Sequence, residues 1–88
     1  MEEYVTVEVN VYSHIKVICG FESKTLSVPV ECKEAFRFVL EWFRENCGIS
    51  SSSVFLMFNG KGANEKTFAG QIVKSGDVFS LMPLLSGG

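Results

Sequence analysis

An unbroken alternation of apolar and polar side chains over residues 4–12 constrains the fold of this chain more than any other feature. Its apolar members are Val5, Val7, Val9 and Val11, and its polar members are Thr6, Glu8 and Asn10. Because successive side chains of a β-strand point to opposite faces, the pattern predicts a strand with one buried face. The chain must therefore build a sheet that has an apolar side.

Two further elements follow this strand. Residues 24–30 alternate in the same way, and Pro29 places their strand near an edge, where a missing N–H does no harm. The stretch between the two strands has no period, which predicts a connection or a short irregular helix. From residue 33 to residue 47 the apolar period becomes helical. The apolar stripe of this predicted helix consists of Phe36, Val39, Leu40, Phe43 and Cys47. Gly48 follows as the expected stop.

The second half of the chain adds two strands. Residues 54–58 form a continuous apolar run that Asn59-Gly60, a strong tight-turn pair, brings to an end. Residues 61–76 are rich in turn residues, and their expected anchors to the core are Phe68, Ile72 and Val73. The last strand spans residues 78–82 and should end before Pro83. This order predicts an α+β domain in which a mixed sheet of four to five strands wraps around one main helix. The first and last strands should be parallel neighbours in its centre.

Composition excludes several classes of protein. A chain of 88 residues, 47% of them apolar, fits one small domain. Its net charge of −2 and its lack of a basic run argue against nucleic acid as a partner. No apolar run approaches the length of a membrane span, and the acidic start does not resemble a signal peptide, so we expect a soluble, cytoplasmic protein without membrane contacts. Three widely spaced cysteines and a single histidine predict neither a disulfide framework nor a metal site.

No residue set indicates a catalytic site within the chain. His14 lacks a recognisable nucleophile partner, and a solvated histidine is favoured over a catalytic base. Cys32 is expected near the start of the helix, where the helix dipole would lower its pKa; the alternatives are a redox role and a small residue tolerated there. Gly60-Lys61-Gly62 lacks the full phosphate-loop pattern and indicates a hairpin turn. Any activity is expected to depend on a partner enzyme.

The chain closes on the unusual sequence Pro83-Leu84-Leu85-Ser86-Gly87-Gly88. With glycine near 7% of residues, two terminal glycines occur by chance about 0.5% of the time. Glycine has little steric demand, so such a terminus can pass through a narrow channel and deliver its carboxylate to another protein. Six extended residues reach about 20 Å. The expected reactive group is the main-chain carboxylate of Gly88.

With these residues in view, the sequence resembles the ubiquitin-like β-grasp sulfur carriers, and most closely the small subunit of molybdopterin synthase. The thiamine sulfur carriers are relatives of that family. The matching segments are the first strand from Val5 to Tyr12, the helix over 33–47, Asn59-Gly60, Ser75-Gly76-Asp77-Val78, and Met82 to Gly88. The resemblance implies a β-grasp domain over 1–82 and a flexible diglycine tail over 83–88.

The resemblance also implies a chemistry. In that family an adenylating enzyme, similar to the ubiquitin activators, uses ATP to convert the terminal glycine into an acyl-adenylate and then a thiocarboxylate. Here the reacting residue would be Gly88, and access would come from Gly87, Ser86, Leu85, Leu84 and Pro83. The large synthase subunit would take the tail and transfer the sulfur during molybdenum or tungsten cofactor assembly. The chain itself would bind no cofactor.

Three other functions remain open. The same chemistry can serve another acceptor, such as thiamine thiazole or tRNA thiolation. A ubiquitin-like modifier would instead join Gly88 to lysines, and an interaction domain would carry an inert tail.

Four apolar residues are candidates for partner docking. Phe38 and Trp42 lie off the helix stripe, and either a loop or the N-terminal arm covers them or a partner does. Phe58 ends a strand with apolar groups on both faces, and Met82 lies beside the tail. This strand, with Met82 and Leu84, is expected to form an exposed sheet patch; the alternative is ordinary core packing.

Overall fold

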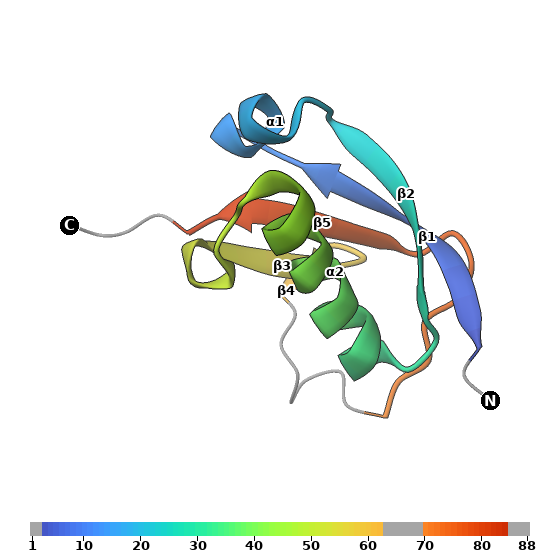
Figure 1. The fold of residues 1–88 in the computed structure, drawn as a ribbon. Coiled ribbons are helices and arrows are strands. Elements are labelled where there is room, and N and C mark those ends of the chain that lie inside the picture. Colours follow the sequence, from blue (N-terminus) through green and yellow to red (C-terminus); the bar gives the residue numbers. More distant parts are fainter. Residues whose placement is uncertain (1–2, 63–69, 85–88) are drawn as a thin grey trace.

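A computed structural model describes residues 3–62 and 70–84 of the chain, and it shows a five-stranded mixed sheet curved around one long helix (Figure 1). The strands are β1 (Tyr4–Val11), β2 (Ser23–Pro29), β3 (Val54–Phe58), β4 (Lys61–Gly62) and β5 (Val78–Pro83). The helices are α1 (His14–Cys19), α2 (Cys32–Cys47) and the single 3₁₀ turn η1 (Ser51–Ser53). The predicted fold class is confirmed.

The sheet places the first and last strands side by side. Its strand order is β2-β1-β5-β3-β4, in which β1 and β5 are parallel and every other pair is antiparallel. The predicted central, parallel pairing of the first and last strands is therefore confirmed. Strand β2 lies at one edge, where Pro29 was expected.

The core lies between one face of the sheet and α2. Alternate residues of β1 are buried there, and so are the stripe residues Phe36, Val39 and Phe43 of α2. Phe79 of β5 is completely buried, and its ring lies 5.7 Å from the Phe36 ring and 5.0 Å from the Phe58 ring, centroid to centroid. This aromatic cluster joins α2 to strands β3 and β5.

Local chemistry fixes both ends of α2. Glu31 caps its start: the Glu31 carboxylate accepts a hydrogen bond of 2.7 Å from the backbone N–H of Glu34, which would otherwise lack a partner within the helix. Gly48 ends it with φ of 69°, a left-handed conformation that glycine adopts without strain. Neither α1 nor α2, the α-helices within 3–62 and 70–84, is long and apolar enough to cross a membrane.

The turn between β3 and β4 confirms the hairpin interpretation of Gly60-Lys61-Gly62. Asn59 and Gly60 both have positive φ, 50° and 82°, as the tight turns favoured in hairpins require. The Asn59 side chain also accepts a hydrogen bond of 2.9 Å from the backbone N–H of Val78 and donates one of 3.2 Å to Asp77. The hairpin is thus bonded to the start of β5.

The expected anchors of the segment before β5 need one correction. Val73 is buried as predicted, but Ile72 is 59% exposed. Neighbouring residues in an extended segment point to opposite sides, so only one of the pair can face the core. Phe68 lies outside the described residues.

Strand β5 continues one residue further than predicted, through Pro83. The N–H of Leu84 donates to the Ser53 carbonyl at 3.0 Å, and N–H groups alternate sides along a strand. The missing N–H of Pro83 therefore faces the β1 side, where pairing with β5 already ends at Leu81. Pro83 therefore removes no hydrogen bond between the strands of the sheet.

Candidate functional site

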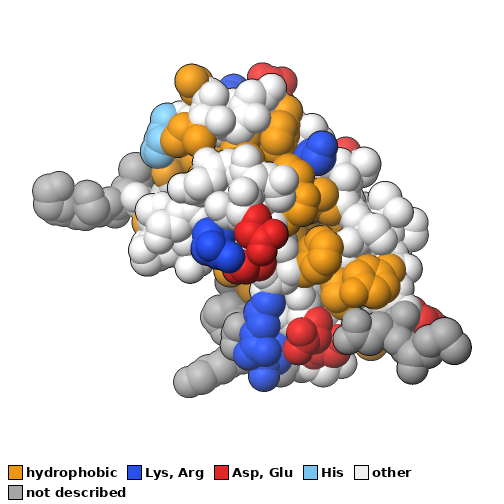
Figure 2. Space-filling view, viewed as in Figure 1, with side chains coloured by type: hydrophobic (Ala, Val, Ile, Leu, Met, Phe, Trp, Pro, Cys, Tyr) orange, Lys and Arg blue, Asp and Glu red, His pale blue; other side chains and the backbone are white. Residues whose placement is uncertain are grey.

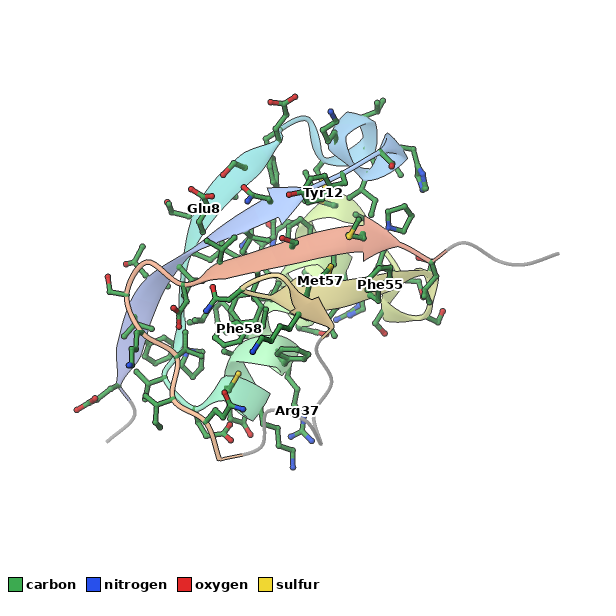
Figure 3. The ribbon with its side chains drawn as sticks, turned by 180° about the vertical axis from the view of Figure 1, so that it is seen from behind. Glu8, Tyr12, Arg37, Phe55, Met57 and Phe58 are labelled. Atoms are coloured by element: carbon green, nitrogen blue, oxygen red, sulfur yellow. The ribbon has the colours of Figure 1, made fainter. Side chains whose placement is uncertain are left out.

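The candidate site begins where β5 ends, on the sheet face opposite α2. Since Val54, Leu56 and Phe58 of β3 point into the core, the alternate residues Phe55 and Met57 point to the other face. Figure 3 shows both on this open side of the sheet. Phe55 is paired with Met82 of β5 and is 38% exposed. Of the predicted sheet patch, Phe55, Met57 and Met82 point to this face, and Leu84 is 51% exposed just after β5.

Helix α1 adds exposed aliphatic side chains beside the same end of the sheet. It contacts β5 and buries only Ile15 (Figure 1). Val17 is 83% exposed and Ile18 is 54% exposed, which is unusual for large aliphatic residues. The prediction of a connection or short helix here is confirmed, but its apolar surface was not expected.

Six accessible apolar residues belong to the segments that adjoin the end of β5, and we call them the exit collar. They are Tyr12, Val17, Ile18, Phe55, Met82 and Leu84. Tyr12, 41% exposed, follows the last residue of β1, and Leu84, 51% exposed, is the final described residue. Of the predicted access residues, Pro83 and Leu84 are thus placed at the collar. Leu85, Ser86, Gly87 and Gly88 lie outside the described residues.

Charged side chains gather over α2 (Figure 2). There, Arg44 is hydrogen-bonded to Glu41, and Arg37 lies 3.6 Å from Glu34. The pair with Arg44 lowers the pKa of the Glu41 carboxyl. Near the collar, Lys16 of α1 pairs with Glu22 at 3.5 Å, and both line a hollow with Tyr12, so the collar is an apolar surface with an ion pair at its margin.

Phe38 and Trp42 do not belong to the collar, because they line a groove on the outer side of α2 with Tyr4 and Pro29. The Phe38 ring meets Tyr4 edge-on at 6.4 Å. The Trp42 ring meets Phe21 edge-on at 6.1 Å. Both rings are half-buried: the loop residue Phe21 packs on Trp42, and Tyr4 of β1 packs on Phe38 where a loop or the N-terminal arm was expected. Their docking role stays a prediction, for a face separate from the tail.

Phe58 needs a correction. It is only 7% exposed and packs on Phe79, so it contributes to the core and offers no docking surface. The apolar run in β3 has two apolar faces, but parity along the strand assigns Phe58 to the inner one. Phe55 takes the outward position that the sequence analysis gave to Phe58.

Cys32 also differs from expectation. Its side chain is fully buried, and burial raises the pKa of its thiol to about 11, with smaller contributions from the negative charges of Glu31 and Asp77. Burial therefore outweighs the helix dipole, and the predicted lowering was wrong. A nucleophilic role for Cys32 has no support. His14, the first residue of α1, is exposed, as expected for a solvated histidine.

Three solved structures have a similar fold. Small archaeal modifier protein 1 from Methanosarcina acetivorans matches with a TM-score of 0.71 and 16% identity, over 98% of this chain and 99% of its own. A putative molybdopterin converting factor subunit 1 from Pyrococcus furiosus matches with a TM-score of 0.69 and 16% identity, over 92% and 99%. Subunits 1 and 2 of the Helicobacter pylori molybdopterin-converting factor form a complex that matches with a TM-score of 0.59 and 25% identity, over 96% and 100%.

The chain has the ubiquitin-like β-grasp fold. No protein-family model matches the sequence, and the comparison with curated proteins gave no match. The likeness to these solved structures, two of them named as molybdopterin-converting factors, is one of fold. In this β-grasp domain the last strand is internal to the sheet, and its end leads from the exit collar into the diglycine sequence.

Proposed function

We propose that this β-grasp protein is a sulfur carrier of the molybdopterin synthase small-subunit type, loaded as a thiocarboxylate on Gly88. One juxtaposition carries the proposal: a diglycine sequence follows β5 after three further residues, and the end of β5 adjoins the exposed apolar side chains of the collar. A carrier needs a slender reactive end and a neighbouring surface that docks the enzyme receiving it. The collar residues and the tail supply these two parts.

The proposed loading takes place on a partner adenylating enzyme that holds ATP. The Gly88 carboxylate attacks the α-phosphorus of ATP and releases pyrophosphate, which leaves an acyl-adenylate. A persulfide donor then attacks the acyl carbon through its terminal sulfur and displaces AMP. Reduction of the resulting acyl disulfide by a thiol frees the thiocarboxylate. The chain contributes the carboxylate and the docking surface, and the partner contributes the catalytic groups.

The proposed acceptor complex pairs the chain with the large subunit of molybdopterin synthase. The Helicobacter pylori neighbour, a complex of subunits 1 and 2, supports this pairing. Delivery of the sulfur would serve molybdenum or tungsten cofactor assembly. In the alternative pathways, thiamine synthesis or tRNA thiolation, the same loaded tail would deliver its sulfur to another acceptor.

The test of loading is intact mass and tail fragmentation after incubation with ATP, a persulfide donor and the adenylating enzyme from the same source. We expect exchange of one oxygen for sulfur, located at Gly88. Fragmentation is required because oxidation of methionine or cysteine adds nearly the same mass. A tail that stays unmodified under conditions in which the enzyme forms adenylate would contradict the proposal.

A second candidate, a ubiquitin-like modifier, is favoured by the likeness to small archaeal modifier protein 1. A modifier would join Gly88 to lysine amines through isopeptide bonds. Conjugates that survive a reducing agent and depend on Gly88 would select this function, whereas a free thiocarboxylate would select the carrier.

Replacing the aliphatic pair of α1 should weaken docking of the large subunit. Burial of a valine or isoleucine side chain contributes about 1.5–3 kcal/mol, so the double change Val17→Ser, Ile18→Ser should raise Kd roughly 10- to 100-fold. Isothermal titration at low and high NaCl would measure it, and wild-type affinity should change little with salt. Ile72→Ser is the matched control, because Ile72 is similarly exposed and lies outside the collar. Unchanged binding of the double variant would exclude α1 from the interface, and an equal loss in the control would show that the effect is not specific to the collar.

A further inference from the structure

Two of the three cysteines occupy matching places in the fold. Cys19 is the last residue of α1 and Cys47 is the last residue of α2. Each is followed by a glycine in the left-handed conformation, Gly20 with φ of 83° and Gly48 with φ of 69°. Because α1 packs on α2, the two helices end together (Figure 1). Cys19 and Cys47, which are far apart in the sequence, therefore lie at neighbouring helix ends.

The two thiols lie near each other at these helix ends, and both side chains are half-buried against the core. Burial, with a smaller contribution from the neighbouring Cys47, raises the pKa of Cys19 to about 12, so its thiol stays protonated at neutral pH. The partial exposure of both residues leaves a route for a small reagent.

Cys32 is excluded from this pair by distance. It is the first residue of the 16-residue helix α2, whereas Cys47 is the last. At 1.5 Å per residue the two ends of the helix lie roughly 22 Å apart. A disulfide requires Cα atoms within about 7 Å, so Cys32 cannot join either partner without unfolding.

We propose that Cys19 and Cys47 form a reversible disulfide that fastens α1 to the end of α2. Exchange with a low-molecular-weight disulfide supplies the oxidant. The Cys47 thiolate attacks one sulfur of the reagent, forms a mixed disulfide and releases the first reagent thiolate. The Cys19 sulfur gives up its proton, attacks the Cys47 sulfur and releases the second thiolate. The two protein thiols are oxidised, and one reagent disulfide is reduced to two thiols that take up the two protons.

The disulfide would reduce the mobility of α1 more than that of α2, the other helix that it joins. Helix α1 has six residues and buries only Ile15, so few contacts hold it in place. It carries Val17 and Ile18, whose positions would then be fixed relative to α2. The proposal does not depend on sulfur loading at Gly88, since both cysteines belong to the folded domain.

The experiment uses the purified full chain equilibrated with oxidised glutathione at mildly alkaline pH. Free thiols are then alkylated, and the protein is digested and analysed by mass spectrometry. We expect a loss of two hydrogen atoms, a peptide pair joined through Cys19 and Cys47, and alkylation of Cys32 after unfolding. The midpoint of thermal unfolding should rise by about 10 °C and return to its first value with dithiothreitol.

Variants make the assignment specific. Cys32→Ala should keep the link and the thermal shift, whereas Cys19→Ala should lose both and carry glutathione on Cys47. The peptide map of the unaltered chain decides the question even if a variant folds poorly. Glutathione on single cysteines without a link, a link that includes Cys32, a link between two chains, or no change after equilibration would each overturn the proposal.

Discussion

Deletion of Gly87 and Gly88 is expected to reduce sulfur loading by at least about 100-fold while the domain stays folded. The deletion withdraws the carboxylate by roughly 7 Å along an extended chain, and a displacement of even 1 Å from a reacting group can cost about 100-fold in rate. It also places Ser86, with a side chain, at the end that must enter the partner. Loading would be followed by intact mass over time with the cognate adenylating enzyme.

The fold of the truncated chain must be checked in the same samples. The described domain ends at Leu84, before the deleted residues, so circular dichroism and the thermal midpoint should match those of the full chain. Docking through the exit collar should persist, because none of its residues is removed. Loading at an unchanged rate would show that the terminal glycines are not the reactive end and would favour the interaction-domain alternative.

Phe79→Ala is expected to remove much of the stability of the domain. Loss of a fully buried phenylalanine costs about 3–5 kcal/mol, because the buried ring surface is lost and a cavity remains. A chain of 88 residues is typically stable by roughly 4–13 kcal/mol. Phe79 also joins Phe36 of α2 to Phe58 of β3, so its loss weakens the contact between helix and sheet. Urea unfolding followed by circular dichroism would measure the change.

Phe55→Ala provides the same chemical change on the neighbouring strand. Phe55 is 38% exposed on the open face, so its removal should lower the free energy of unfolding by less than about 1 kcal/mol. It should weaken docking instead, since Phe55 belongs to the collar. Similar losses of stability in the two variants would contradict the assignment of these faces.

The regular elements could be predicted from the sequence because their side-chain periods are long and unbroken. The alternating valines of β1 and the apolar stripe of α2 each bury one face, and the structure confirms both. The stop at Gly48 and the turn at Asn59-Gly60 follow from backbone conformations that few residues adopt easily. These are local properties, which a single sequence contains.

The candidate site was less predictable because it depends on packing between distant segments. The six residues of α1 are too few to show a period, so the exposed Val17 and Ile18 were missed. Inward and outward positions in β3 cannot be told apart when every residue is apolar, hence the error at Phe58. The proximity of Cys19 and Cys47 depends on two helix ends and has no local sequence signal.

The internal position of β5 has a consequence for biosynthesis. Strand β3 is bonded to β1 only through β5, and β5 is the last strand to leave the ribosome. During translation β1 and β2 can pair, but the two halves of the sheet stay separate until β5 has emerged. Folding therefore depends on contacts between its first and last segments, which form late and slowly. A nascent chain that stalls before β5 would leave the inner face of β3 accessible to chaperones. The sheet is therefore completed at about the time when the diglycine sequence, which follows β5, is synthesised.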